Sequence, residues 1–250
     1  MPVHYLRALT SPGRTTENNR RLGRSLAFVA GAANAGGFLA VGQYTSHMTG
    51  IVSALADHAV LGNAVLVTAG LCSLLAFMTG AAVSAILINW GRRRGAQSEY
   101  AMPLMLEAAL LLVFGLLGTQ LAEHRMFFVP ATVGLLCFIM GLQNAIITKI
   151  SKSEIRTTHM TGVATDIGIE IGKLFYWNVQ GGAPDAKVMA NRPRLRLLAS
   201  LLGMFLLGGV TGALGFKHMG FVATVPLATL LIVLAIVPVF DDLAALGRRF

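Results

Sequence analysis

Six stretches of mainly apolar residues constrain this sequence more than any other feature. A helix needs about 20 such residues to cross the hydrocarbon core of a bilayer. Only 12% of the residues are charged, against about 25% in soluble domains, and the mean hydropathy is +0.68. The sequence therefore predicts an all-α, multi-pass membrane protein. The expected spans are Leu22–Tyr44, Asn63–Trp90, Pro103–Ala122, Met126–Thr148, Leu195–Phe216 and Phe221–Phe240.

The basic residues predict how these six transmembrane helices are oriented. With a cytoplasmic N-terminus, all but Arg125 and Lys217 of the 20 lysine and arginine residues fall in cytoplasmic segments, in agreement with the positive-inside rule. We therefore expect both termini to be cytoplasmic, with tails over residues 1–21 and 241–250. The net charge of +9 then follows from topology and does not indicate a nucleic-acid partner. An alternative of eight spans adds Met48–Gly62 and Thr158–Trp177, but it places Arg92–Arg94 outside.

A hexapeptide that occurs twice divides the sequence into two halves. Thr-Ser-His-Met-Thr-Gly covers Thr45–Gly50, and Thr-Thr-His-Met-Thr-Gly covers Thr157–Gly162. Each copy follows a Gly-x-x-Asn-Ala segment and precedes first a helical-looking stretch and then a span that contains Thr-Gly-Ala. These flanking segments are Gly31–Ala35 and Gly141–Ala145 before the copies, and Thr79–Ala81 and Thr211–Ala213 after them.

Each half contains three spans, which is an odd number, so the second half must be inserted upside down relative to the first. We therefore predict two inverted three-helix repeats, residues 22–122 and 126–240, each with an extra short motif helix. The first hexapeptide would lie on the outer side of the membrane and the second on the cytoplasmic side. Transporters built from inverted repeats bind their substrates at the repeat interface, often with interrupted helices. A duplication that preserves packing alone is the alternative.

The hexapeptides have the composition of helix starts. Ser46 and Thr158 are expected N-cap residues for helices over Met48–Leu61 and Met160–Trp177. The first turn of a helix presents free N–H groups and the positive end of the dipole, which favour anions. The two histidines of the motif, His47 and His159, either gate the path and couple it to protons or bond a neighbouring carbonyl.

Polar residues near the motifs add candidates for a substrate path. Asn34, Gln143 and Asn144 carry amides in or near spans, where a polar group needs a partner, and Gly36-Gly37 would let the first span break. Asp57 is a candidate intramembrane carboxylate, whereas Asp166, on one face with His159, also fits the solvated face of an amphipathic helix. Glu107 is expected to reach the interface. The candidate path residues are Asn34, Thr45, Ser46, His47, Thr49, Gly50, Asp57, Gln143, Asn144, Thr157, Thr158, His159, Thr161, Gly162 and Asp166.

The segments around the hexapeptides resemble a known family. Asn34–Gly50, Gly141–Ser151 and Arg156–Gly172 are similar to the YoaK family of bacterial inner-membrane proteins, a domain of unknown function. The resemblance extends from about Arg24 to Phe240. It implies a six-span protein of the bacterial inner membrane, and it implies no substrate and no catalytic residues. Many members have another residue where this sequence has His47.

Two functions are open on these observations. The first is a transporter or channel for a small molecule or ion, for which helix starts and a basic inner face favour an anion or weak acid. The second is a non-transporting membrane scaffold or sensor that binds lipid or partner proteins. We do not expect an enzyme, a cofactor or a metal site, because the sequence has no phosphate-binding loop, nucleophile elbow or metal-ligand cluster. Lipid is the expected environment, and homo-oligomer formation is left open.

Overall fold

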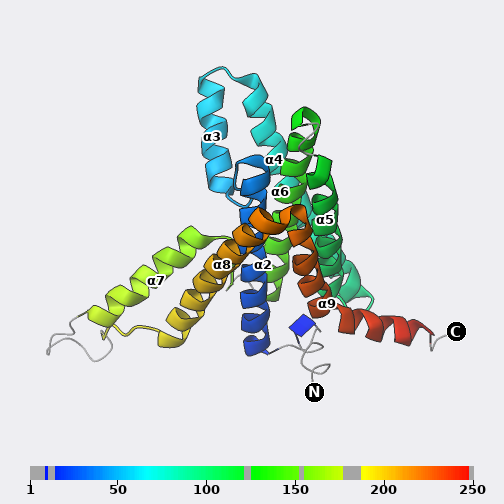
Figure 1. Ribbon diagram of the computed structural model, residues 1–250. Coiled ribbons are helices and arrows are strands. Elements are labelled where there is room, and N and C mark those ends of the chain that lie inside the picture. Colours follow the sequence, from blue (N-terminus) through cyan, green and yellow to red (C-terminus); the bar gives the residue numbers. More distant parts are fainter. Residues whose placement is uncertain (1–8, 11–14, 121–124, 152–154, 177–186, 248–250) are drawn as a thin grey trace.

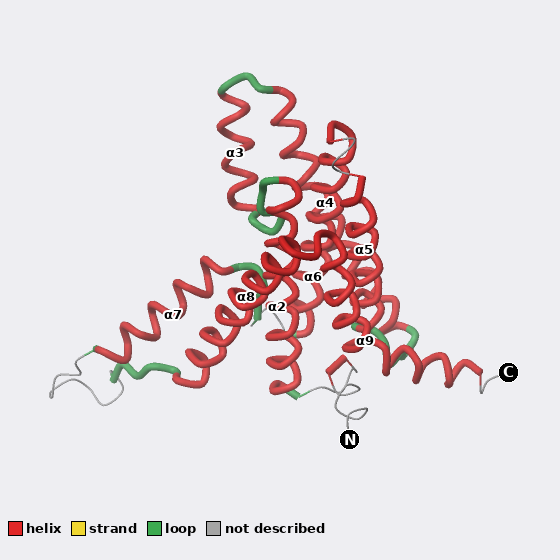
Figure 2. The backbone as a smooth tube through the Cα atoms, viewed as in Figure 1, coloured by secondary structure: helices red, strands yellow, loops and turns green. Residues whose placement is uncertain are grey.

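A computed structural model describes residues 9–10, 15–120, 125–151, 155–176 and 187–247. In these residues the chain is helical, without strands (Figures 1 and 2). A helix runs along each of the six apolar stretches, and a shorter helix begins within each hexapeptide, as predicted. The elements are α2 (Thr16–Val41), α3 (Met48–Val60), α4 (Ala64–Arg93), α5 (Ala101–Gln120), α6 (Arg125–Ile150), α7 (Met160–Phe175), α8 (Arg192–Met219), η2 (Gly220–Ala223) and α9 (Thr224–Gly247).

Five continuous helical stretches are long and apolar enough to cross a membrane. Four of them correspond to α2, α4, α5 and α6. The fifth covers 54 residues, Arg192–Ala245, and contains α8, η2 and α9. This architecture is compatible with a multi-pass membrane protein. Helix α2 begins before Leu22 and α9 continues past Phe240, while Trp177, the expected end of the second motif helix, lies outside the described residues.

The motif helices α3 and α7 are too short to be further spans. Helix α3 has 13 residues and α7 has 16, which correspond to about 20 Å and 24 Å at 1.5 Å per residue, against about 30 Å for a hydrocarbon core. Each packs on the long helix that follows it, α3 on α4 and α7 on α8. They start near the middle of the molecule and run apart, α3 to the top and α7 to the lower left (Figure 1).

Asparagines begin the two long helices that follow the motif helices. Asn63 Oδ1 accepts a hydrogen bond from the Leu66 N–H at 3.2 Å, and Asn191 Oδ1 accepts one from the Arg194 N–H at 3.0 Å. Such caps satisfy N–H groups that have no partner within the helix. Because α4 and α8 start from the same kind of cap, their residues can be compared position by position.

The most extensive contacts join α2 to α8 and α4 to α6. Glycines set both crossings. A side chain on Gly31 would overlap the carbonyl oxygen of Phe205, and one on Gly208 would overlap that of Phe28. In the other pair, Gly80 lies against the carbonyl oxygen of Phe138 and Gly141 against that of Phe77. Each helix therefore contributes a Phe-x-x-Gly segment, and the small residue lets two backbones approach closely.

This contact pattern corrects the alignment of the two halves. Counted from their asparagine caps, Phe77 and Gly80 of α4 are equivalent to Phe205 and Gly208 of α8, and they make the same contacts. The Thr-Gly-Ala segments that the sequence suggested as equivalent are one turn out of register, because Gly212 faces Ala32 of α2 instead. Side-chain size at the helix crossing, rather than the local sequence match, determines which residues correspond.

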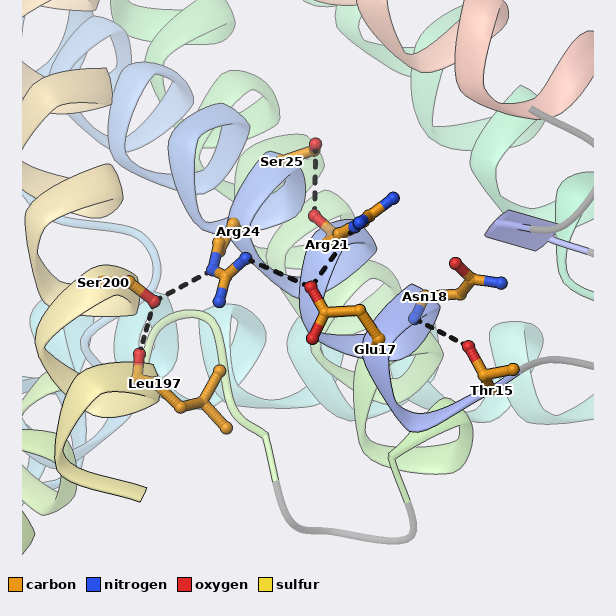
Figure 3. Close-up of polar contacts among 8 residues, drawn as sticks. All are labelled: Thr15, Glu17, Asn18, Arg21, Arg24, Ser25, Leu197 and Ser200. Carbon is orange, nitrogen blue, oxygen red and sulfur yellow. Dashed lines mark hydrogen bonds and ion pairs between the residues drawn. The ribbon is translucent and has the colours of Figure 1, made fainter. Parts of the chain in front are cut away.

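A polar network joins the starts of α2 and α8 (Figure 3). Glu17 accepts a hydrogen bond from Arg21 Nε at 3.3 Å and lies 3.9 Å from Arg24 Nη1. Arg24 Nε donates to Ser200 Oγ at 3.0 Å, and that hydroxyl donates to the Leu197 carbonyl at 2.7 Å. These contacts hold the N-terminal turns of both long helices together.

Candidate functional site

The two hexapeptides meet at one cavity of about 300 Å³. Four residues of the first copy line it, and so do the four equivalent residues of the second copy. The sequence predicted the copies on opposite sides of the membrane; the structure brings the motifs themselves together at one cavity, from which their helices run apart. The cavity is lined by Ser46, His47, Met48, Thr49, Phe77, Asn144, Thr148, Arg156, Thr158, His159, Met160 and Thr161.

Each hexapeptide is tied to the preceding long helix by a matching hydrogen bond. Ser46 Oγ donates to Asn34 Oδ1 at 2.9 Å, and Thr158 Oγ1 donates to Asn144 Oδ1 at 2.8 Å. Asn144 Nδ2 donates in turn to the Met140 carbonyl at 2.8 Å. The asparagines of the Gly-x-x-Asn-Ala segments thus position the motifs, and four predicted residues come together in two equivalent pairs.

The helix starts differ from the prediction by one residue. The N-cap positions are His47 and His159, and neither side chain makes a capping hydrogen bond. Ser46 and Thr158 do not cap, because their hydroxyl groups are used by the asparagines. The first N–H groups of α3 and α7 consequently have no side-chain cap, which is the condition under which a helix start attracts an anion.

The histidine and the glycine of each motif form a unit. The His47 imidazole lies over Gly50, and the His159 imidazole lies over Gly162, so that a Cβ on either glycine would overlap the ring. Both histidines are exposed and both line the cavity. The glycine therefore leaves room for the imidazole at the cavity wall.

The first threonine of each motif is buried. Thr45 and Thr157 are 0% exposed, and neither hydroxyl has a hydrogen-bond partner among the described residues. A buried hydroxyl without a partner costs about 1–3 kcal/mol. Thr49 and Thr161, by contrast, are exposed at the cavity. The two copies share the same burial at all six positions.

Other candidates lie away from this cavity. Asp57 is exposed on α3 and is not among the residues that line the motif cavity. Gln143 is buried, and its Nε2 donates to the Leu26 carbonyl at 3.3 Å. Asp166 pairs with Arg194 at 2.9 Å in an adjacent cavity. The predicted break at Gly36-Gly37 is wrong, because α2 continues to Val41 and Gly36 instead lets the Phe216 ring approach.

Sequence reasoning missed two groups. Glu107 does not reach the interface, because its side chain is 0% exposed. Both carboxyl oxygens lack a hydrogen-bond partner among the described residues, and the nearby polar side chain is that of Gln143. Arg156 lines both the motif cavity and the adjacent one. A signal for Arg156 was its position directly before the second hexapeptide. For Glu107 the only signal was a carboxyl group within an apolar run.

Most of the chain that carries this geometry matches a known family. The family described as "Protein of unknown function (DUF1275)" matches residues 22–237. The chain belongs to this family. The match confirms the expectation of a family of unknown function that spans nearly the whole chain, and it does not test the name YoaK. No curated protein and no solved structure matches.

In this DUF1275 chain the cavity offers hydroxyl, amide and imidazole groups beside one guanidinium. These groups donate and accept hydrogen bonds and favour a small polar or anionic solute. Among the described residues, no three His, Cys, Asp or Glu side chains gather closely enough to hold a metal ion. The arrangement fits reversible binding of a solute through equivalent groups from two sides.

Proposed function

We propose that this protein is a transporter or channel for a small anion or weak acid, with its binding site at the motif cavity. One observation carries the proposal: equivalent residues of two separate hexapeptides line a single polar cavity between the long helices. A packing role for the motif would require no cavity at this place. Two equivalent sets of binding groups around one centre suit a solute that enters the cavity from either side of the membrane.

The proposal includes six spans arranged as two inverted repeats of the bacterial inner membrane, with both termini cytoplasmic. Three observations support it. The stretch Arg192–Ala245 contains two long helices, α8 and α9. The contacts of α2 with α8 repeat those of α6 with α4. The motif helices diverge from the shared centre, α3 toward the top and α7 toward the lower left (Figure 1), which is compatible with inverted repeats.

Two neighbouring polar cavities favour transport over simple binding. A second cavity of about 740 Å³ shares Arg156 and His159 with the motif cavity. It extends to the starts of α2 and α8, where Arg20 and Arg194 line it. Uncapped N–H groups and guanidinium groups at these two cavities favour an anion. A scaffold or sensor, the other function considered, needs no such pair of polar cavities.

Flux through liposomes tests the proposal. The purified protein would be reconstituted into vesicles that contain a pH-sensitive dye, and potassium salts of small anions and weak acids would be screened. We expect the wild type to carry flux of at least one solute. That flux should fall by about tenfold or more in each of two double variants, Asn34→Ala/Asn144→Ala and Ser46→Ala/Thr158→Val. Each pair removes the hydrogen bonds that position the motifs, and a small misplacement at a site can cost about 100-fold.

The matched control is Ser53→Ala/Thr211→Val. It removes two exposed hydroxyl groups that line neither the motif cavity nor the cavity next to it, and it should retain wild-type flux. Absence of flux for every solute in the screen, or equal flux in all variants, would exclude the motif cavity as a transport site and favour the scaffold or sensor.

A further inference from the structure

The cavity next to the motifs brings three arginines from different parts of the chain together. Arg20 comes from the first turns of α2, Arg156 precedes the second hexapeptide, and Arg194 lies at the start of α8. The volume is about 740 Å³, more than twice that of the motif cavity. The other lining residues are His159, Gly162, Val163, Asp166, Asn191, Pro193, Leu198 and Leu201.

The positive charge of this arginine cavity is only partly balanced within the described chain. Asp166, the one carboxylate of the lining, pairs with Arg194 at 2.9 Å. Arg20 and Arg156 have no hydrogen bond or ion pair with any described residue, and Arg20 Nε is buried without a partner. A buried N–H of a charged group that lacks a partner is costly. The cavity therefore has both the charge and the unused donors to hold an anion.

The arginines beside it are in a different situation. Arg21 bonds to Glu17, and Arg24 lies between Glu17 and Ser200 (Figure 3). Both guanidinium groups thus have partners, and Arg24 also joins α2 to α8 through Ser200. The start of α2 thus carries Arg21 and Arg24 outside the cavity, both with partners, and Arg20 in the cavity lining without one. A generally basic helix end does not explain why the arginine without a partner is the one at the cavity.

We propose that the arginine cavity binds the phosphate group of an anionic ligand, either the headgroup of a phospholipid or a free phosphate. Guanidinium groups match phosphate oxygens with paired hydrogen bonds. Two positive charges in excess match a phosphate monoanion or dianion better than a carboxylate. The cavity is larger than a phosphate group, which leaves room for the rest of the ligand. This inference does not depend on transport, because binding is measured without flux.

Binding to the purified full-length protein in neutral detergent tests the site. One arm titrates sodium phosphate against sodium chloride of equal ionic strength. The other titrates short-chain phosphatidylglycerol against short-chain phosphatidylcholine, whose phosphate is neutralised by choline. We expect at least one phosphate probe to bind and to raise the thermal midpoint. A response to sodium phosphate identifies a free phosphate ligand, and a response to phosphatidylglycerol alone identifies a lipid headgroup.

Two variants with equal loss of charge localise the site. Arg20→Gln/Arg156→Gln should raise the dissociation constant by about tenfold or more, since hydrogen bonds to charged groups are worth about 1.5–3 kcal/mol. Arg21→Gln/Arg93→Gln, which changes exposed arginines outside the cavity, should bind as the wild type does. If the first variant fails to fold, Arg156→Lys keeps the charge and should still weaken binding. Equal affinity in both double variants, or no response to either probe, overturns the proposal.

Discussion

At the scale of single residues, the glycine of each hexapeptide has a specific purpose. It leaves space for the imidazole of its own motif, so Gly162 and His159 act together. Gly168 lies on the same helix, α7, with open space around it. The two glycines therefore separate the general effect of glycine in a helix from its effect on the histidine.

We expect Gly168→Ala to raise the free energy of unfolding by about 0.5–1 kcal/mol, because alanine favours a helix. Gly162→Ala should show little or none of this gain, since the new methyl group displaces the His159 ring. It should also reduce solute flux, which Gly168→Ala should leave unchanged. Thermal unfolding in detergent and flux in vesicles measure both effects. An equal gain in the two variants would contradict the contact between His159 and Gly162.

Glu107 is the residue that sequence position misjudged. Its place near the start of the third apolar stretch suggested an interfacial carboxyl, but the side chain faces Gln143 inside the bundle. Which way it faces depends on how α5 packs on α6, and no local pattern in the sequence encodes that. By contrast, the hexapeptides, their histidines and the two asparagines could be predicted, because each occurs twice at equivalent positions.

Replacement of Glu107 tests its burial. Glu107→Gln should raise the free energy of unfolding by about 1 kcal/mol or more, because folding no longer removes a carboxyl group from water and the amide can donate to Gln143. Glu107→Ala should be less stable than Glu107→Gln, since it leaves a void and an unpaired amide oxygen. Denaturation in detergent compares the three proteins. A large loss of stability in Glu107→Gln would indicate that an ion pair holds the carboxylate.

At the scale of helices, the crossings of α2 with α8 and of α4 with α6 determine the packing. Gly208 and Gly203 on α8 form a matched pair, since the first lies on the Phe28 carbonyl and the second faces open space. Gly208→Ala should lower the free energy of unfolding by about 1–3 kcal/mol through overpacking. Gly203→Ala should be neutral or slightly stabilising. Unfolding curves decide this, and equal stability of the two variants would exclude the close crossing.

Helix α7 is joined to the start of α8 through Glu170. The carboxylate accepts hydrogen bonds from Lys173 Nζ at 2.8 Å and from the Asn191 N–H at 2.6 Å. The Lys173 hydrogen bond, followed by the Asn191 backbone hydrogen bond, lowers the pKa of Glu170 below its ordinary value. The pairing of Glu170 with Lys173 is local, because the two residues are three apart on one helix, but the contact with Asn191 depends on the fold.

The pH dependence follows from the direction of this shift. A carboxyl group whose folded pKa is lowered stabilises the protein above the unfolded pKa of about 4.3, and this contribution is lost as the pH falls through the folded pKa. The thermal midpoint of the wild type should therefore exceed that of Glu170→Gln at pH 7, and the difference should shrink below about pH 4. A difference that does not change between these pH values would contradict the two hydrogen bonds of the carboxylate.

At the scale of the whole molecule, the sequence predicted a helix along each of the six apolar stretches and one after each hexapeptide, and the described residues contain these helices, since apolar length is a local property. It did not predict that the two hexapeptides meet. The positive-inside rule assigns loops to sides of the membrane, but it contains no information on how deep a segment lies between other helices. The contacts of α2 with α8 and of α4 with α6 bring both motifs to one centre, from which α3 and α7 diverge (Figure 1).

This arrangement predicts where the far ends of the motif helices lie. Gly62 follows α3, and Lys187 precedes α8 on the side of α7. Single cysteines at these positions, in a background without Cys72 and Cys137, should react with an impermeant thiol reagent from opposite sides of the membrane. Cells and inverted vesicles provide the two sides, and cysteines on the N- and C-terminal tails, such as Arg7→Cys and Arg249→Cys, should both react from the side of Lys187. Labelling of Gly62→Cys and Lys187→Cys from the same side would exclude inverted repeats, because two repeats of like orientation place equivalent segments on one side.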